Sequence, residues 1–514
     1  MAGNTKGSES SEVNHPPTPD SPPSGEALDR SALAGAAWSS GAKWSTQIFA
    51  WAGTVLVARI LTPADIGLLT VAGVFIAVVL ILSESGIGAT VLMLRELSVE
   101  ETRQLNSVSV ILGVGASVFT AVMAHPLGLF FRAPQLPPVL TLIGLTFLIK
   151  SFQTIPAAIL RRNLRFRTAA LIDVVRGLVV PVVTLIGALI GLRYWALAIG
   201  NVVGAVITAG LTIYASPVSF RRPDFAKLGP VLNYSRHLLV SRLAWVTYSN
   251  GDFAVAGRRL SMSSVGDYGM AWTLATSPIE KVTMVVAEVT PPIFSAAQHD
   301  RAALRRYFLN FSELLSCLTI PAATGLALIA HDLVTVVLGP KWVGVAAPLA
   351  LLAVYAGIRS VTILYAYLFT AVRDTRFAMW NSMGLAVLLI TGFIIGSAWG
   401  PVGIATAWLI VHPAVSVYTF MRVQRSIELK ASTYLRALRL GIDGAAIMAA
   451  VLLAFQTFVA ASWPASLRLA ASIILGAVVY AGTTYVLHGT RIRTVLAWMR
   501  RVRGGAPVSV SDVA

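Results

Sequence analysis

Six basic residues lie deep inside long apolar stretches of this chain, where a charged side chain is expensive to place. If each stretch is a membrane helix rising about 1.5 Å per residue, they lie roughly 13–23 Å from its start. One cation at the bilayer centre costs about 2.5–3.5 kcal/mol, so six would cost on the order of 15–20 kcal/mol. A whole domain is stable by only about 5–15 kcal/mol. The six side chains must therefore face the protein interior or a water-filled cavity: Lys43, Lys150, Arg176, Arg242, Lys281 and Arg359.

Such a set of cations, facing one cavity, would bind an anionic cargo. The alternative is structural ion pairing, because acidic residues occur at comparable depth: Asp173, Asp252, Glu280, Glu288, Glu313 and Asp443. Asp173 and Arg176 are three residues apart on one helical face, so we expect them to pair. Trp44 and Trp245 lie close to Lys43 and Arg242 and are candidates for stacking on a sugar, although membrane tryptophans more often pack or anchor at the interface.

The composition places these residues in a membrane protein. The 514-residue chain is 56% hydrophobic and 12% charged, about half the charged fraction of a soluble protein. Its net charge of +17 is divided among short clusters between apolar segments, which favours a membrane topology signal over nucleic-acid binding. The chain lacks nucleotide-loop, HExxH and paired Cys/His motifs, so we expect no metal, no cofactor and no enzymatic activity.

Fourteen apolar stretches are long enough to cross a membrane, which predicts an all-α polytopic fold. Of the 40 Lys and Arg residues, 26 fall in the loops and tails of one side and seven in those of the other. The positive-inside rule then places both termini in the cytoplasm. The predicted spans are 32–58, 65–90, 104–124, 136–160, 167–190, 194–215, 231–256, 266–294, 303–330, 346–371, 377–397, 401–421, 435–460 and 464–487.

A phrase repeated within the chain indicates two related halves. VARILTPADIG at residues 57–67 resembles AGRRLSMSSVGDYG at 256–269, and Lys43 precedes Arg59 by the same sixteen residues that separate Arg242 from Arg258. Two parallel repeats with a substrate site between them are typical of transporters. We therefore expect a disordered cytoplasmic tail (1–30), two six-helix lobes (31–220 and 221–432), two further helices (433–488) and a basic cytoplasmic tail (489–514).

Several longer stretches carry a family resemblance over roughly residues 35–490. They are GAKWSTQ, VARILTPADIGLLTVAGVF and SESGIGATVL in the first half, and GDFAVAGRRLSMSSVGDYGMAW, VTPPIFSAAQHDRAALRRYF and DLVTVVLGPKW in the second. Through these stretches taken together, the chain resembles the Wzx-type oligosaccharide flippases of the multidrug/oligosaccharidyl-lipid/polysaccharide superfamily. Within these polysaccharide transporters it looks most similar to the colanic-acid-exporter branch.

The resemblance implies a V-shaped pair of lobes working by alternating access. The implied cargo is a polyprenyl-diphosphate-linked oligosaccharide, the repeat unit of a surface polysaccharide such as a lipopolysaccharide or exopolysaccharide. It would cross the bacterial cytoplasmic membrane from the inner to the outer leaflet, with the six cations around its acidic head group and the last two helices beside its lipid tail. A polysaccharide polymerase or other biosynthetic protein is the implied partner.

The resemblance also assigns gating or ion coupling to acidic residues. Asp252 falls where the family has an acidic residue in span seven, and Asp173 and Glu280 are further candidates. Three alternatives stay open: a drug or small-molecule exporter of the same superfamily, a membrane glycan polymerase or ligase, and a scaffold of a biosynthetic complex. An exporter of cationic drugs would want an acidic cavity, and a polymerase or ligase a large outer loop.

Overall fold

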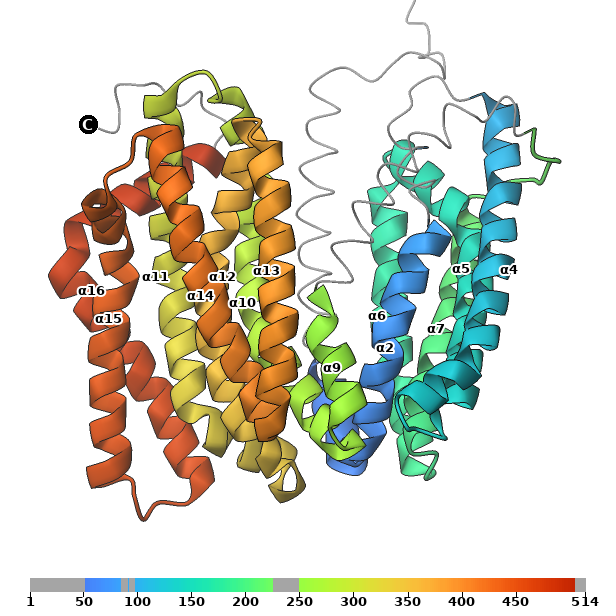
Figure 1. Ribbon diagram of the computed structural model, residues 1–514, viewed down its shortest axis with the longest axis horizontal. Helices are drawn as coiled ribbons and strands as arrows, with labels where there is room; N and C mark the ends of the chain where they lie inside the picture. Colours follow the sequence, from blue (N-terminus) through green and yellow to red (C-terminus); the bar gives the residue numbers. More distant parts are fainter. Residues whose placement is uncertain (1–50, 85–90, 92–97, 225–248, 504–514) are drawn as a thin grey trace, which may run out of the picture.

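The computed structural model describes residues 51–84, 91, 98–224 and 249–503, and within these residues it is helical, with no strand. Two bundles of helices stand side by side and meet near one end (Figure 1). The first holds the helix Trp51–Ile60 and five longer helices. Those five are α2 (Pro63–Glu84), α4 (Val99–Phe130), α5 (Leu136–Arg162), α6 (Phe166–Leu189) and α7 (Tyr194–Ala215).

The second bundle follows the same plan and carries an appendage. It begins with the short helix α9 (Gly251–Arg259), which lies between the two bundles in Figure 1. Five long helices complete it: α10 (Met262–Ala296), α11 (Arg301–Leu333), α12 (Ala346–Ala371), α13 (Thr375–Gly396) and α14 (Gly400–Ile427). Two more helices, α15 (Ala431–Ala454) and α16 (Ala465–Arg503), pack on the side of this bundle that faces away from the first.

Polar caps fix where several of these apolar helices begin. Ser98 and Glu101 form a reciprocal capping box at the start of α4, and the Asp300 carboxylate accepts from the Ala302 and Ala303 backbone amides at the start of α11. The Asp65 carboxylate accepts from the Thr62 amide and hydroxyl where α2 begins. These contacts satisfy amide groups that have no partner within their own helix.

Twelve of the fourteen predicted spans coincide with long helices. The predicted bounds of 194–215 and 346–371 match α7 and α12. The others differ by up to six residues at an end, except that the last prediction, 464–487, stops where α16 kinks at His488, whereas the helix continues to Arg503. Spans one and seven lie mostly outside the described residues, which leaves the count of fourteen without confirmation. By length and composition, ten stretches of the described chain can cross a membrane, one of which joins α13 to α14. The protein is therefore a multi-pass membrane protein. α10 is absent from the ten, and it carries Asp267, Glu280, Lys281 and Glu288.

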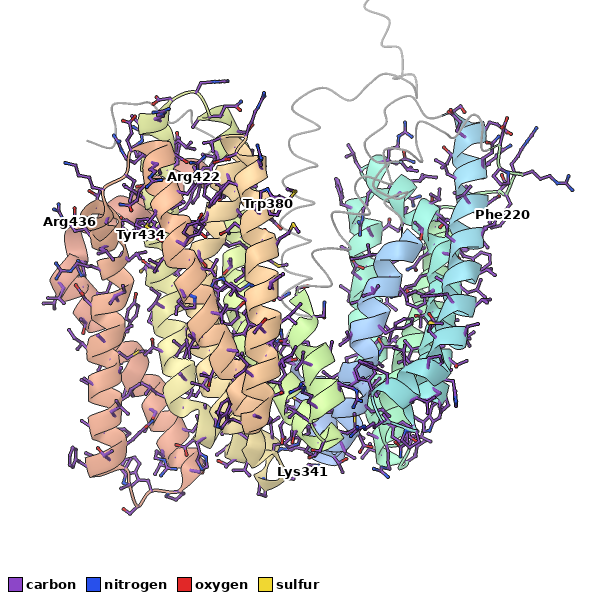
Figure 2. All side chains as sticks on the ribbon, in the orientation of Figure 1. Phe220, Lys341, Trp380, Arg422, Tyr434 and Arg436 are labelled. Atoms are coloured by element: carbon purple, nitrogen blue, oxygen red, sulfur yellow. The ribbon has the colours of Figure 1, made fainter. Side chains whose placement is uncertain are left out.

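The turns sort basic residues toward opposite ends of the bundles. Figure 2 places Lys341 at the end where the bundles meet, and Arg422 and Arg436 near the other end. Pro63 and Met262, the first residues of α2 and α10, lie at the end with Lys341, which we call the joined end. An ion pair of 3.2 Å between Arg193 Nε and Asp65 Oδ1 ties the α6–α7 turn to the start of α2 there.

Candidate functional site

The two bundles touch through a pair of glycines at the joined end. A Cβ atom added to Gly67 of α2 would lie 1.8 Å from the carbonyl oxygen of Met262, and one added to Gly266 of α10 would lie 1.8 Å from that of Pro63. Gly67 and Gly266 are 199 residues apart, as are Pro63 and Met262. The contact is thus reciprocal, as expected when two related halves meet about a pseudo-two-fold axis. Only glycine permits so close a backbone approach.

Hydrogen bonds from the repeated phrase cross the same contact. The Arg59 guanidinium donates to the carbonyl oxygens of Val336 (2.6 Å) and Val337 (2.8 Å), just beyond the end of α11. In return, Lys341 Nζ donates to the Arg59 carbonyl at 2.8 Å. Trp342 Nε1 donates to the Ala58 carbonyl, also at 2.8 Å. Four donors therefore join the turn before α2 to the segment that connects α11 with α12.

The matching arginine of the second half makes the matching contact. Arg258, at the end of α9, lies over the ring of Phe130, the last residue of α4, with 5.5 Å from its guanidinium carbon to the ring centre. Arg59 thus reaches beyond the third helix of the second half, while Arg258 reaches the end of the third helix of the first. This arrangement explains the repeat: both copies build the contact between the lobes.

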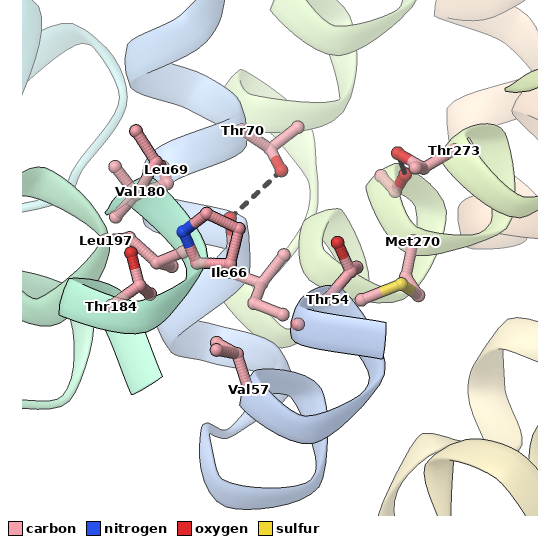
Figure 3. A pocket seen from close by; sticks show the side chains of 13 residues that line it. Thr54, Val57, Ile66, Leu69, Thr70, Val180, Thr184, Leu197, Met270 and Thr273 are labelled. Carbon is pink, nitrogen blue, oxygen red and sulfur yellow. Dashed lines mark hydrogen bonds between the residues drawn. The ribbon is translucent and has the colours of Figure 1, made fainter. Parts of the chain in front are cut away.

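A pocket of about 340 Å³ lies immediately beside this contact, and we call it the inter-lobe pocket (Figure 3). Thr70 of α2 and Thr273 of α10 each donate a hydroxyl hydrogen to a carbonyl of their own helix, which leaves oxygen lone pairs available. The other labelled side chains in Figure 3 are Thr54, Val57, Ile66, Leu69, Val180, Thr184, Leu197 and Met270. Both halves of the chain therefore contribute to it.

Two of the predicted cations lie on the helices that line this pocket. Arg176 precedes the lining residue Val180 by about one turn of α6, and Lys281 follows the lining residue Thr273 by about 12 Å along α10. Because α6 ends and α10 begins at the joined end, both cations lie farther from that end than the pocket does. Both are exposed. Neither makes an ion pair with any residue that the structure describes.

The other predicted site residues divide into three groups. Arg359 of α12 forms a 3.0 Å ion pair with Glu280 of α10, which favours structural pairing for this one cation. Lys150 is partly buried in α5 and has an interaction of its own. Four predicted residues lie outside the described part of the chain: Lys43, Trp44, Arg242 and Trp245.

The expected pair of Asp173 and Arg176 is not formed. Both side chains are exposed on α6, and among the described residues neither has an ion-pair partner. The spacing prediction was wrong for a physical reason. An exposed ion pair contributes only about 0–1 kcal/mol to stability. Here that gain does not outweigh the conformational entropy that the two side chains would lose by pairing.

Asp252 lies in a buried polar cluster that its sequence position did not reveal. One carboxylate oxygen accepts from Tyr268 Oη at 2.7 Å and Trp408 Nε1 at 3.1 Å, and the other accepts from the Phe253 amide at 2.8 Å. The carboxylate is fully buried. These bonds link α9 to α10 and α14. Tyr268 and Trp408 gave no signal in the sequence beyond being aromatic residues in apolar helices.

A second, larger pocket of about 720 Å³ lies between the second bundle and its appendage. Its walls come from Trp51 and Val55 of the first lobe and from α10, α11, α15 and α16, and they are almost entirely apolar. Gly325, Met448 and Gly476 are among the lining residues. We call it the apolar pocket. A space of this size and character suits part of a hydrocarbon chain.

Solved structures with the same arrangement of helices are transporters. The lipid II flippase MurJ in an inward closed conformation aligns with a TM-score of 0.73 at 13% identity, over 88% of this chain and 99% of that one. An inward-facing multidrug resistance MATE transporter of the MOP superfamily aligns at 0.59 and 14% identity, over 75% and 96%. At such low identity these likenesses establish the fold alone.

Proteins related by sequence are more similar to this chain than the solved structures are. The lipopolysaccharide biosynthesis protein WzxC of Escherichia coli K12 is 26% identical over 390 residues, which are 73% of this chain and 78% of WzxC. The succinoglycan biosynthesis transport protein ExoT of Rhizobium meliloti is 23% identical over 486 residues, 92% of this chain and 97% of ExoT. The family model described as polysaccharide biosynthesis protein matches residues 56–347, more than half of the chain. As the Wzx-type resemblance predicted, this chain belongs to the polysaccharide biosynthesis protein family.

Proposed function

We propose that this protein is a flippase for a polyprenyl-diphosphate-linked oligosaccharide, the repeat unit of a surface polysaccharide. It acts in the bacterial cytoplasmic membrane, with both termini in the cytoplasm, and moves its cargo to the outer leaflet without enzymatic chemistry. The observation that supports this most is the reciprocal contact at the joined end. Two related lobes that meet at one end through matched residues can part there and close at the other, which is what alternating access requires.

The charge of the inter-lobe region suits the cargo. Lys281 and Arg176 have no acidic partner among the described residues, and they lie beyond the inter-lobe pocket on the side away from the joined end. A diphosphate carries negative charge, and basic side chains bind phosphate oxygens through charge-assisted hydrogen bonds. We assign the diphosphate to these two residues together with Lys43, Lys150 and Arg242, and the sugars to Trp44 and Trp245. Arg359 would join them only by releasing Glu280, with which it pairs at 3.0 Å.

The lipid tail needs an apolar path of its own. The apolar pocket opens between α10, α11, α15 and α16, beside the helices that the sequence predicted to guide the tail. We propose that part of the polyprenyl chain lies there while the head group crosses between the lobes. Asp173, Asp252 and Glu280 remain the proposed gate or ion-coupling residues. Binding of a cation by Asp252 would require its three hydrogen bonds to rearrange.

The decisive experiment depletes the protein and follows polyprenyl-linked glycans by mass analysis with sidedness probing. Accumulation of one glycan in the cytoplasmic leaflet supports the flippase and names its substrate. Accumulation of unpolymerised units in the outer leaflet would instead place the block after flipping, as for a polymerase or a scaffold.

Complementation with Lys281→Gln then tests the site. We expect export to fall at least about tenfold at normal protein abundance, because a charge-assisted hydrogen bond is lost. Lys430→Gln, a matched change at an exposed lysine in the turn between α14 and α15, should export normally. Normal export by the Lys281 variant would contradict its role in binding the head group.

A further inference from the structure

A polar pocket of about 460 Å³ lies in the first bundle, at the opposite end from the inter-lobe contact. It is built where α4 begins, where α5 ends, and where the chain continues after α7. Its lining contains two arginines, an asparagine and two hydroxyl residues, and no carboxylate among the described residues. The members are Val99, Thr102, Arg103, Ile159, Arg162, Asn163, Pro217, Val218 and Ser219. We call it the rim pocket.

The wall after α7 is held in place by contacts to α4. Asn106 Nδ2 donates to the Val218 carbonyl at 3.1 Å, and the Arg221 amide donates to Ser107 Oγ at 3.1 Å. The Asp224 amide donates to Gln104 Oε1 at 3.3 Å. Residues 217–224 therefore lie across α4 in a fixed position, so that the pocket is formed before any ligand arrives.

The two acidic residues in the first turn of α4, next to the lining residue Thr102, are already engaged. Glu100 pairs with Arg221, with 2.5 Å between Oε1 and Nε. Glu101 accepts from the amide and hydroxyl of Ser98, each at 2.8 Å. The start of α4 and the end of α5 present opposite ends of two helix dipoles, which offset each other. The basic side chains that line the pocket are Arg103 and Arg162, and Arg162 also has an interaction of its own, which leaves other N–H donors of its guanidinium for a ligand.

Apolar side chains beside the pocket are exposed in a way that suits lipid. Val99 is 70% exposed and Phe220 57% exposed, and Phe220 follows the lining residue Ser219. Figure 2 shows Phe220 at the outer edge of the first bundle, on the side facing away from the second. The rim pocket is thus separate from the inter-lobe pocket, and it combines cations with an apolar border as a lipid head-group site does.

We propose that the rim pocket binds the phosphate of an anionic glycerophospholipid, with Arg103 and Arg162 as the cationic ligands. Asn163 and Ser219 supply neutral donors around the phosphate and the polar head, whereas the Thr102 hydroxyl donates to the Ser98 carbonyl at 2.9 Å. The acyl chains lie against the exposed apolar surface next to Val99 and Phe220. This lipid is a resident of the protein's outer surface and is distinct from the transported cargo.

Native mass spectrometry of the purified protein tests this with phosphatidylglycerol, phosphatidylcholine and inorganic phosphate as probes. We expect phosphatidylglycerol to be retained in preference to phosphatidylcholine, and free phosphate not to displace it. In the double variant Arg103→Gln/Arg162→Gln the affinity for phosphatidylglycerol should fall at least about tenfold. The control Arg436→Gln, an exposed arginine of α15 near the same end of the molecule, should bind as the unmodified protein does.

A second variant keeps the charges and fills the space. Ser219→Trp changes an exposed residue, so it should fold normally while blocking the rim pocket and reducing phosphatidylglycerol binding. Unchanged affinity in either test variant overturns the proposal, as does equal binding of phosphatidylcholine. Displacement by inorganic phosphate alone would show that the pocket takes a free anion, which overturns the lipid assignment.

Discussion

Replacing Gly67 by alanine should weaken the closed state of the joined end. The new methyl group would lie 1.8 Å from the Met262 carbonyl oxygen, whereas real Cβ contacts essentially never fall below 3.0 Å. The start of α2 and that of α10 must therefore separate by at least 1.2 Å. Overpacking of this kind costs about 1–3 kcal/mol. A state in which the lobes have parted there does not carry this cost, so the ratio of open to closed molecules should rise roughly 5- to 150-fold.

The separation also strains the hydrogen bonds that cross the contact. Arg59, Lys341 and Trp342 donate over 2.6–2.8 Å to carbonyls of the other lobe, and a shift of more than 1 Å breaks bonds of this length unless the side chains follow. Their loss adds to the effect of the methyl group. We therefore expect Gly67→Ala to affect the opening of the joined end more than the folding of either lobe.

Cysteine labelling measures this opening directly. Cys317 is the single cysteine of the chain, so a Cys317→Ala background allows a reporter at Val71→Cys. Val71 is fully buried and lies against Gly257 of the other lobe. In purified protein, Gly67→Ala should raise the rate of maleimide labelling at this reporter by the factor given above.

A matched control lies on the same helix. At Gly73 of α2 an added Cβ meets nothing within 4 Å, so Gly73→Ala should label at the rate of the unmodified protein. If Gly67→Ala is folded and labels no faster than Gly73→Ala, the glycine contact does not govern the opening of this end, and the reasoning fails.

Three further predictions concern other parts of the chain. Asp252→Asn should lower the thermal unfolding temperature in detergent, because its NH2 group must replace one of the two carboxylate oxygens, each of which accepts from a donor. If the amide oxygen stays toward Tyr268 and Trp408, the NH2 group faces the Phe253 amide and leaves a buried donor unsatisfied, at about 1–3 kcal/mol; an unchanged transition would contradict a structural role for this cluster. Arg468→Ala should destabilise the packing of α16 on α11, because it removes both bonds to the buried Asp332 carboxylate, of 2.7 and 2.5 Å; limited proteolysis between α15 and α16 should become faster, and equal cleavage would refute the role of this pair. Deleting residues 1–28, a polar proline-rich segment, should leave glycan export intact in a complementation assay, and loss of export at normal abundance would give the segment a function.

Much of the helical plan followed from the sequence, because the bilayer imposes a length and a polarity on every span. The run 346–371 was placed correctly from its apolar residues alone, and the repeated phrase around Arg59 and Arg258 indicated two related halves. Each of these signals is local or periodic, so a single chain displays it without knowledge of what packs against what.

The contacts between distant helices could not be predicted in this way. Glu280 and Arg359 are 79 residues apart, and nothing in their spacing selects one partner over another acid of similar depth. Asp173 and Arg176, which do have pairing geometry along one helix, stay apart. The phrase around Arg59 indicated a repeat, but nothing in it predicted that the guanidinium reaches the Val336 and Val337 carbonyls of the other lobe. Every residue has a backbone carbonyl, so the sequence does not indicate which carbonyl an arginine side chain will bond to.

The apolar cluster at the joined end has a consequence for the ionic integrity of the cell. Ala58, Leu68 and Val71 of the first lobe share one buried cluster with Tyr268 and Trp342 of the second. Protons and small ions cross a protein along chains of water, which such a cluster excludes. The membrane potential is worth about 2.3 kcal/mol per charge for each 100 mV, and this apolar cluster is the barrier that keeps ions from crossing under it. In its closed state, a carrier for a bulky head group can thereby stay in the membrane without letting protons and small ions leak down their gradients.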